Sequence, residues 1–185
     1  MGTTSAVAAI DYRADKVRLP VRQKIPRFRV RPGDVTRLVR EQRARSLVLD
    51  VEPFICLWGT DDEALTTGLS TMLATATEIE TLTHVALLTN SRRVPSVLPR
   101  DGRLAVTYRV RARKPWLKLA ELRSLPRPLV VVGDQPLTDG LVAWRLGAPF
   151  LQLVLPDGAR LPVRLQARLG GLLAPIFFSR EPLSS

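Results

Sequence analysis

Short apolar runs alternate with helical segments along most of this chain, and this alternation constrains the fold more than any other feature of the sequence. Such runs, rich in Leu, Val and Ala, are typical of strands buried on both faces of a parallel sheet. They lie at residues 46–51, 84–89, 104–110, 128–134 and 150–155. Capping residues and good helix formers predict helices at residues 35–45, 61–79, 115–122 and 138–146. The sequence therefore predicts an α/β fold, a three-layer Rossmann-like arrangement with helices on both faces of a parallel sheet.

The length and composition are those of one globular domain. The chain has 185 residues, of which 45% are hydrophobic and 24% are charged. Residues 1–32 show no clean period and include Pro20 and Pro26, so we predict a basic N-terminal arm over residues 1–32 and a single domain over residues 33–185. Near the C-terminus, residues 161–173 form a basic amphipathic segment.

Residue counts exclude several kinds of site. The chain has one cysteine, Cys56, and one histidine, His84, which excludes a disulfide framework, a multi-Cys zinc site and a His-rich metal site. No apolar run is long enough to span a membrane, and the short apolar N-terminus lacks the basic start of a secretory signal. We therefore expect a cytoplasmic protein.

The positive charge of the chain is concentrated in two segments. The net charge is +11; residues 1–45 contain twelve basic and four acidic residues, and residues 92–114 contain eight basic residues and one acidic residue. A basic surface attracts nucleic acid, anionic lipid or phosphorylated substrates, and it says nothing about fold. A nucleic-acid-binding module is one alternative, but the chain has no recognition motif and only 5% aromatic residues. We do not expect nucleic acid to be its main partner.

Polar residues stand where the predicted strands end. Asp50, Thr89 and Asp134 each lie at the carboxyl end of an apolar run, and Lys114 follows the third run by a few residues. Ligands of open α/β sheets bind outside the carboxyl ends of the strands, so these four side chains should converge. Carboxylates gathered there would repel one another unless a cation lay between them, and hard oxygen ligands suit Mg²⁺. With a lysine and a hydroxyl nearby, such a site can neutralise a phosphoryl group and present a carboxylate to it.

At these residues the sequence resembles the haloacid dehalogenase (HAD) superfamily, and more closely its YqeG-like, subclass IIIA phosphatases. The resemblance covers about residues 45–155 and rests on four blocks in order. The blocks are Leu49-Asp50-Val51-Glu52 continuing to Trp58, Leu88-Thr89-Asn90-Ser91, Ala112-Arg113-Lys114-Pro115, and Val132-Gly133-Asp134-Gln135-Pro136-Leu137-Thr138-Asp139. The resemblance implies an Mg²⁺-dependent phosphatase that hydrolyses phosphomonoesters through a phospho-aspartate.

The resemblance also implies a role for each site residue. Asp50 would be the nucleophile, and Glu52 would stand at the position of the general acid/base. Lys114 would bridge the nucleophile and the phosphoryl group. The implied metal ligands are Asp50, the backbone carbonyl of Glu52, Asp134 and Asp139. The implied substrate-binding residues are Thr89, Asn90 and Lys114.

The first block departs from the family pattern. The family has Asp two residues after the nucleophile, followed by Asn and Thr, whereas this chain has Glu52, Pro53 and Phe54. The extra methylene of Glu52 displaces its carboxylate, Pro53 lacks a backbone donor, and Phe54 would bring a ring beside the phosphoryl position. The alternative function is therefore a catalytically impaired binding or regulatory protein with the same fold.

The spacing of the blocks leaves no room for a cap domain. Open, capless sites in this family suit large substrates, and its relatives include a phosphatidylglycerophosphate phosphatase. The resemblance therefore implies a large or lipid phosphate as the substrate, with a phospholipid at a membrane surface as one such partner and a peripheral position at that surface.

Overall fold

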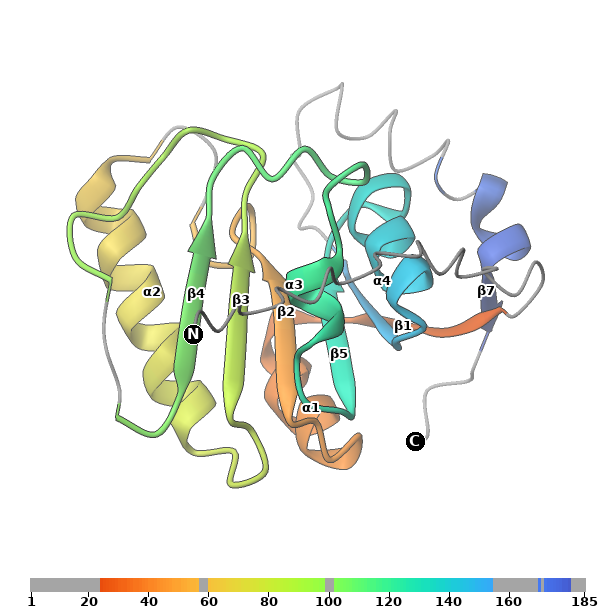
Figure 1. The fold of residues 1–185 in the computed structure, drawn as a ribbon, viewed down its shortest axis with the longest axis horizontal. Helices are drawn as coiled ribbons and strands as arrows, with labels where there is room; N and C mark the ends of the chain where they lie inside the picture. The colour runs from red at the N-terminus through yellow and green to blue at the C-terminus, as the bar shows by residue number, and fades with distance from the viewer. Residues whose placement is uncertain (1–23, 57–59, 99–101, 155–169, 171, 181–185) are drawn as a thin grey trace, which may run out of the picture.

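The computed structural model describes residues 24–56, 60–98, 102–154, 170 and 172–180. Within them, seven parallel strands form one sheet in the order β4-β3-β2-β5-β6-β1-β7 (Figure 1). The strands are β1 (Ile25–Val30), β2 (Ser46–Asp50), β3 (His84–Leu88), β4 (Ala105–Arg109), β5 (Leu129–Gly133), β6 (Phe150–Leu153) and β7 (Phe178–Arg180). The predicted parallel α/β sheet is confirmed, and the described residues contain no cap domain.

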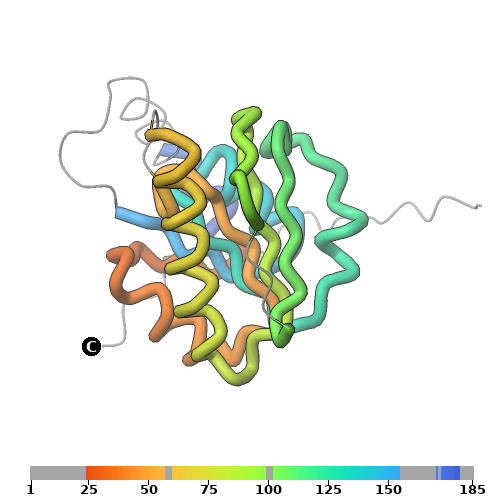
Figure 2. The backbone as a smooth tube through the Cα atoms, turned by 90° about the vertical axis from the view of Figure 1, so that its left-hand side faces the viewer, coloured from red at the N-terminus to blue at the C-terminus, as the bar shows by residue number. Residues whose placement is uncertain are grey.

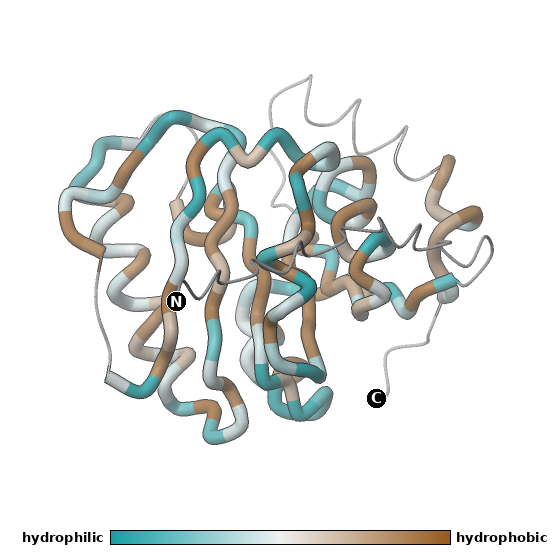
Figure 3. The backbone as a smooth tube through the Cα atoms, in the orientation of Figure 1, coloured by the Kyte–Doolittle hydropathy of each residue, from teal (hydrophilic) through white to brown (hydrophobic). Residues whose placement is uncertain are grey.

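Helices cover both faces of the sheet. One face carries α1 (Val35–Glu41) and α2 (Asp62–Thr77), and the other carries α3 (Ala120–Arg123) and α4 (Leu141–Leu146) (Figures 1 and 2). Alternate residues of a strand enter opposite cores: Leu47 and Leu49 of β2 pack toward α1 and α2, and Val48 packs toward α4. The central strands are accordingly mostly hydrophobic along their length (Figure 3).

Local sequence signals explain where the main helices begin and end. The side chain of Asp61 accepts a hydrogen bond of 2.8 Å from the backbone of Ala64 and caps α2. The buried residues of α2 recur every three or four positions and face the sheet; they are Leu65, Leu69, Leu73 and Ala76. Gly147 ends α4 in the left-handed conformation, with φ of 62°, which only glycine adopts without strain.

Two strands were not predicted from the sequence. Residues 25–30, which we assigned to the N-terminal arm, form β1 between β6 and β7, so the arm prediction is corrected there. Pro26 and the arginines of β1 break the apolar pattern by which a buried strand is predicted. Arg27 is accommodated in the sheet because its Nε donates to Oε1 of Gln152 on β6 over 2.8 Å. Residues 1–23 of the arm and most of the amphipathic segment 161–173 lie outside the described residues.

Three predicted helices differ from the structure. The helix expected over residues 35–45 ends at Glu41, where the chain turns toward β2. The helix expected over residues 115–122 is limited to α3, because the chain forms a turn at Lys114 and Pro115 and is irregular from there to residue 119. The helix expected from residue 138 begins earlier, as a π-helical turn over Pro136–Gly140 that continues into α4. In that turn the backbone N–H groups of Thr138, Asp139 and Gly140 all donate to the carbonyl oxygen of Gln135.

Candidate functional site

The polar residues at the carboxyl edge meet where the strand order changes direction. From β2 the chain continues to β3 on one side, and it later returns to β5 on the other side of β2. Asp50 ends β2, Thr89 follows β3, and Asp134 follows β5. Such a switch point leaves a crevice at the carboxyl ends of the strands, and it is the usual ligand position in open α/β sheets.

Lys114 lies between two carboxylates at this crevice. Its Nζ is 2.6 Å from Oδ1 of Asp50 and 2.7 Å from Oδ1 of Asp139. All three side chains are at least nine-tenths buried. Burial alone would lower the pKa of Lys114, but the charges of Asp139 and Asp50 outweigh it and hold the pKa above its ordinary value. Lys114 is therefore a fixed positive charge between two anions.

The loop that carries Lys114 is attached to the loop after β3. The backbone N–H of Ala112 donates to the carbonyl of Thr89 over 2.8 Å, and that of Arg111 donates to the carbonyl of Ser91 over 2.9 Å. The side chain of Asn90 completes the attachment, because its Oδ1 accepts a hydrogen bond of 2.8 Å from the backbone of Lys114. These bonds set the position from which the lysine reaches the carboxylates.

Asp134 is the one member of the acidic cluster without a positive partner. Both of its carboxylate oxygens are buried and accept no hydrogen bond of normal geometry from the described residues. Burial, reinforced by the charge of Asp139, raises the pKa of Asp134 to about 7. Burial and the charge of Asp139 also raise the pKa of Asp50 well above its ordinary value. A buried carboxylate with no partner needs either a proton or a cation.

A metal ion fits this cluster. One carboxylate oxygen from each of Asp50, Asp134 and Asp139 lies within 4.8 Å of the others. Three carboxylates face the single charge of Lys114, so one divalent cation would balance the remaining two charges. Carboxylate oxygens are hard ligands of the kind that Mg²⁺ or Ca²⁺ prefers.

Glu52 is held by two hydroxyl groups beside the cluster. Its Oε2 accepts a hydrogen bond of 2.6 Å from Oγ1 of Thr89, and its Oε1 accepts one of 3.1 Å from Oγ of Ser91. Thr89 Oγ1 in turn accepts the backbone N–H of Ser91 over 2.9 Å. The longer side chain of glutamate thus has a fixed orientation. Sequence reasoning missed the role of Ser91, although this residue stands in the same block as Thr89 and Asn90.

A small cavity opens over these residues. Its volume is about 180 Å³, which is room for a group the size of phosphate together with a few water molecules. It is lined by Asp50, Glu52, Asn90, Ser91, Lys114, Gln135 and Thr138. The structure therefore gives a small ligand access to Asp50, Glu52 and Lys114, while Thr89, Asp134 and Asp139 lie beneath them and are buried.

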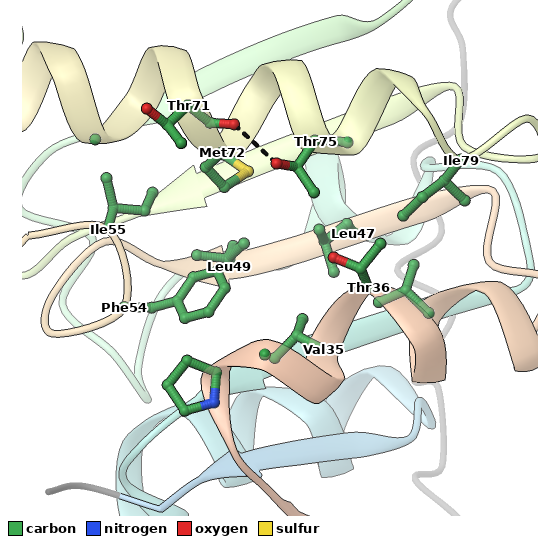
Figure 4. A pocket seen from close by; sticks show the side chains of 15 residues that line it. Val35, Thr36, Leu47, Leu49, Phe54, Ile55, Thr71, Met72, Thr75 and Ile79 are labelled. Atoms are coloured by element: carbon green, nitrogen blue, oxygen red, sulfur yellow. Dashed lines mark hydrogen bonds between the residues drawn. The ribbon is translucent and has the colours of Figure 1, made fainter.

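The expected position of Phe54 is wrong. Its ring does not line the cavity at the acidic cluster but lies in a separate apolar pocket of about 530 Å³ between α1, α2 and β2 (Figure 4). The ring packs against the core on that face of the sheet, because the chain after Glu52 turns toward α2. Gly68 of α2 permits the close approach, since a Cβ there would lie 2.4 Å from the carbonyl oxygen of Ile55.

Arg93 connects the loop after β3 to the start of α2, and sequence reasoning missed it as well. Its guanidinium donates to the carbonyl oxygen of Asp61 over 2.7 Å and to Oγ1 of Thr60 over 3.3 Å. Its backbone N–H donates to Oγ of Ser91 over 3.2 Å. Arg93 thus links Ser91, whose hydroxyl binds Glu52, to Thr60 and Asp61 at the start of α2.

None of the helices in the described ranges is long and apolar enough to cross a membrane. Comparisons of the chain with protein-family models, with curated proteins and with solved structures give no match. The function of the chain must therefore be inferred from the geometry of this site.

Proposed function

We propose that this protein is an Mg²⁺-dependent phosphatase of the HAD type, which hydrolyses phosphomonoesters through a phospho-aspartate at Asp50. The observation that carries the proposal is the buried lysine between Asp50 and Asp139, beside the unpartnered carboxylate of Asp134. A phosphoryl group is anionic, so a carboxylate attacks it readily only where positive charge is fixed nearby.

Asp50, Asp134 and Asp139 would hold the metal, together with the backbone carbonyl of Glu52 that the family resemblance implies. The orphaned oxygens of Asp134 and the excess of carboxylates over Lys114 support this assignment. When bound, Mg²⁺ supplies positive charge that favours an anionic phosphoryl group beside the carboxylates.

Different residues of the chain act as nucleophile, as general acid/base and as ligands of the phosphoryl group. Lys114 holds Oδ1 of Asp50, which leaves Oδ2 to attack the phosphorus atom as the bond to the leaving-group oxygen breaks. In its protonated form, Glu52 gives a proton to that oxygen, and it then takes one from the water molecule that attacks the phospho-aspartate. The second displacement releases phosphate and restores the Asp50 carboxylate. Asn90 and Lys114, which line the cavity, would bind the phosphoryl oxygens, whereas the hydroxyl of Thr89, to which the resemblance gives the same role, is buried and donates to Glu52.

The openness of the site supports a large substrate. No cap domain covers the cavity in the part of the chain that the structure describes, so the remainder of a substrate can extend into solvent. A large or lipid phosphate, such as a phospholipid presented at a membrane surface, is the substrate class that we propose. The protein would then work at the periphery of that surface.

The direct test is hydrolysis of p-nitrophenyl phosphate and of a panel of phospholipid phosphates, with and without Mg²⁺. We expect turnover that disappears with a chelator and returns when Mg²⁺ is restored. Turnover that is unaffected by the chelator would reject the metal-dependent mechanism, and the absence of turnover on every substrate would favour the alternative below.

Mg²⁺ is expected to raise the melting temperature of the protein by about 5–10 °C at concentrations near a hundred times its Kd. The reason is that a bound cation relieves the repulsion among the buried carboxylates, which the unfolded chain does not have. Differential scanning calorimetry of the wild type and of Asp134→Asn measures the effect, with NaCl of equal ionic strength as the control. An equal shift in the Asp134→Asn variant would show that the cation binds elsewhere.

A second candidate is a catalytically impaired binding or regulatory protein. One observation favours it: the carboxylate of Glu52 already occupies the hydroxyls of Thr89 and Ser91, which a phosphoryl group would otherwise use. Restoring the family pattern with Glu52→Asp, Pro53→Asn and Phe54→Thr separates the two functions. An inert wild type and an active restored variant would establish the impaired protein; substantial turnover by the wild type would exclude it.

Glu52→Gln gives a sharper test of the acid role. The amide keeps the size of the side chain but cannot donate the proton that an alkoxide leaving group needs, so we expect turnover of an alkyl phosphate to fall about a hundredfold or more. Turnover of p-nitrophenyl phosphate, whose leaving group departs without protonation, should fall much less in its phosphorylation step. Single-turnover kinetics on both substrates measures the difference. Equal losses on both would assign Glu52 a structural role.

A further inference from the structure

Three exposed arginines lie in the two loops that carry Asn90, Ser91 and Lys114 to the cavity. Arg92 directly follows Ser91, and Arg113 directly precedes Lys114, so both adjoin residues that line the cavity. Arg111 lies beside them, because its backbone N–H donates to the carbonyl of Ser91. None of the three side chains has an acidic partner within the described ranges. We call Arg92, Arg111 and Arg113 the basic rim.

Two of the three arginines of the basic rim have an unfavourable backbone conformation. Arg111 and Arg113 have φ of 46° and 55°, in the left-handed region that costs a residue with a side chain about 1–2 kcal/mol. Ala112 between them is buried, so both arginines point away from the core toward solvent. Glycine or asparagine would relieve the strain at either position, yet both carry long cationic side chains beside the site. Strain of this kind is concentrated at functional sites.

Exposed apolar side chains occur in the same two loops as the basic rim. Trp116 is 85% exposed, and its backbone N–H donates to the carbonyl of Arg113, which places it next to the rim. Val94 and Val97 follow Arg92 in the loop after β3 and are 59% and 63% exposed. Contact of such side chains with an apolar partner is favourable, because it removes apolar surface from water.

We propose that the basic rim, together with Trp116, Val94 and Val97, binds an anionic lipid surface and thereby brings the cavity to a phosphate at that surface. Arginine side chains attract anionic headgroups, and tryptophan prefers the boundary between headgroups and acyl chains. Nucleic acid fits this surface less well, because of its three apolar side chains only Trp116 offers a ring on which a base can stack. The benefit to hydrolysis rests on the proposed function, whereas the binding itself does not.

Sedimentation with vesicles tests the proposal without any catalytic step. The full chain should bind vesicles that contain phosphatidylglycerol and should not bind pure phosphatidylcholine vesicles, and binding should weaken as salt is raised. The triple variant Arg92→Gln, Arg111→Gln and Arg113→Gln should bind about a hundredfold more weakly, since each basic residue near the surface contributes about a factor of five to ten. Trp116 should shift its fluorescence to shorter wavelength on binding, and Trp116→Phe should abolish that change.

A matched control removes the same charge from the opposite edge of the sheet. Arg40, Arg43 and Arg45 are exposed near the amino end of β2, and Arg43 also has a positive φ, of 48°. Their triple replacement by Gln should leave vesicle binding within about threefold of the wild type. An equal loss in both triple variants would overturn the proposal, as would equal binding to pure phosphatidylcholine or tighter binding to single-stranded RNA than to anionic vesicles.

Separate variants test lipid binding by the basic rim and catalysis at Asp50. Asp50→Asn should bind anionic vesicles as the wild type does, and the rim variant should hydrolyse p-nitrophenyl phosphate at the wild-type rate. Normal vesicle binding without any hydrolysis would refute the catalytic proposal alone. Normal hydrolysis without vesicle binding would refute the docking surface alone.

Discussion

Replacing Asp50 with Asn is expected to lower phosphatase turnover at least about a thousandfold while the protein remains folded. The amide has the shape of the carboxylate but cannot form the phospho-aspartate. The fold should tolerate the change, because Asp50 is buried among like charges that raise its pKa, and Lys114 keeps Asp139 as a partner 2.7 Å away. Steady-state kinetics on p-nitrophenyl phosphate and a thermal melt of the same preparation measure both effects.

The control for this prediction is Asp34→Asn, which removes a partly exposed carboxylate that is not a member of the cluster. Within the part of the chain that the structure describes, the side chain of Asp34 pairs with Arg37 alone, through an exposed ion pair of 3.4 Å, so neither turnover nor melting temperature should change appreciably. Turnover by Asp50→Asn within tenfold of the wild type would mean that another group attacks the phosphorus. A melting temperature many degrees lower would assign Asp50 a structural role instead.

Replacing Gly133 with Ala is expected to destabilise the protein by about 2–4 kcal/mol and to weaken Mg²⁺ binding. A Cβ at position 133 would lie 2.4 Å from both Cγ and Oδ2 of Asp139, closer than any real contact. The side chain of Asp139 would have to move, and its contact with Lys114 would be lost. Chemical denaturation and an Mg²⁺ titration of the melting temperature measure the two consequences.

Gly102→Ala provides the matched control for that steric argument. A Cβ at Gly102 would meet no atom within 4 Å, so the same change of residue should alter stability by less than about 1 kcal/mol. If Gly133→Ala were as stable as this control and bound Mg²⁺ equally well, the position of Asp139 against β5 would not matter to the site. The assignment of Asp139 to the metal site would then be wrong.

The sequence predicts the centre of this fold better than its borders. Four of the five strands that it predicts, β2, β3, β5 and β6, are buried apolar runs, and their pattern needs no tertiary information. The fifth, β4, is a partly exposed edge strand. In contrast, β1 contains Pro26, Arg27 and Arg29, which are unusual in a buried strand. Arg27 fits there because it bonds to Gln152 of β6, and the sequence does not reveal that partner. The strand β7 has three residues, too few for any periodicity.

The candidate site shows a similar division. Strand ends are sufficient to bring Asp50, Thr89 and Asp134 to one edge, because parallel strands share a direction. The direction in which a side chain points cannot be predicted from the sequence. Phe54 points into the apolar pocket rather than toward the phosphoryl position, and Glu52 accepts a hydrogen bond from the hydroxyl of Thr89. The departure from the family pattern that seemed to obstruct the site therefore leaves the cavity open at Asp50 and Glu52.

The central claim is that Asp50 becomes phosphorylated during turnover, and chemical trapping tests it most directly. Enzyme that is quenched during hydrolysis and treated with borohydride converts an aspartyl phosphate to homoserine, which peptide mass spectrometry locates. Phosphorylation of Asp50 predicts homoserine at position 50 in the wild type, dependent on Mg²⁺ and on substrate. Turnover with no modified residue at position 50, or with the modification at another aspartate, would contradict it.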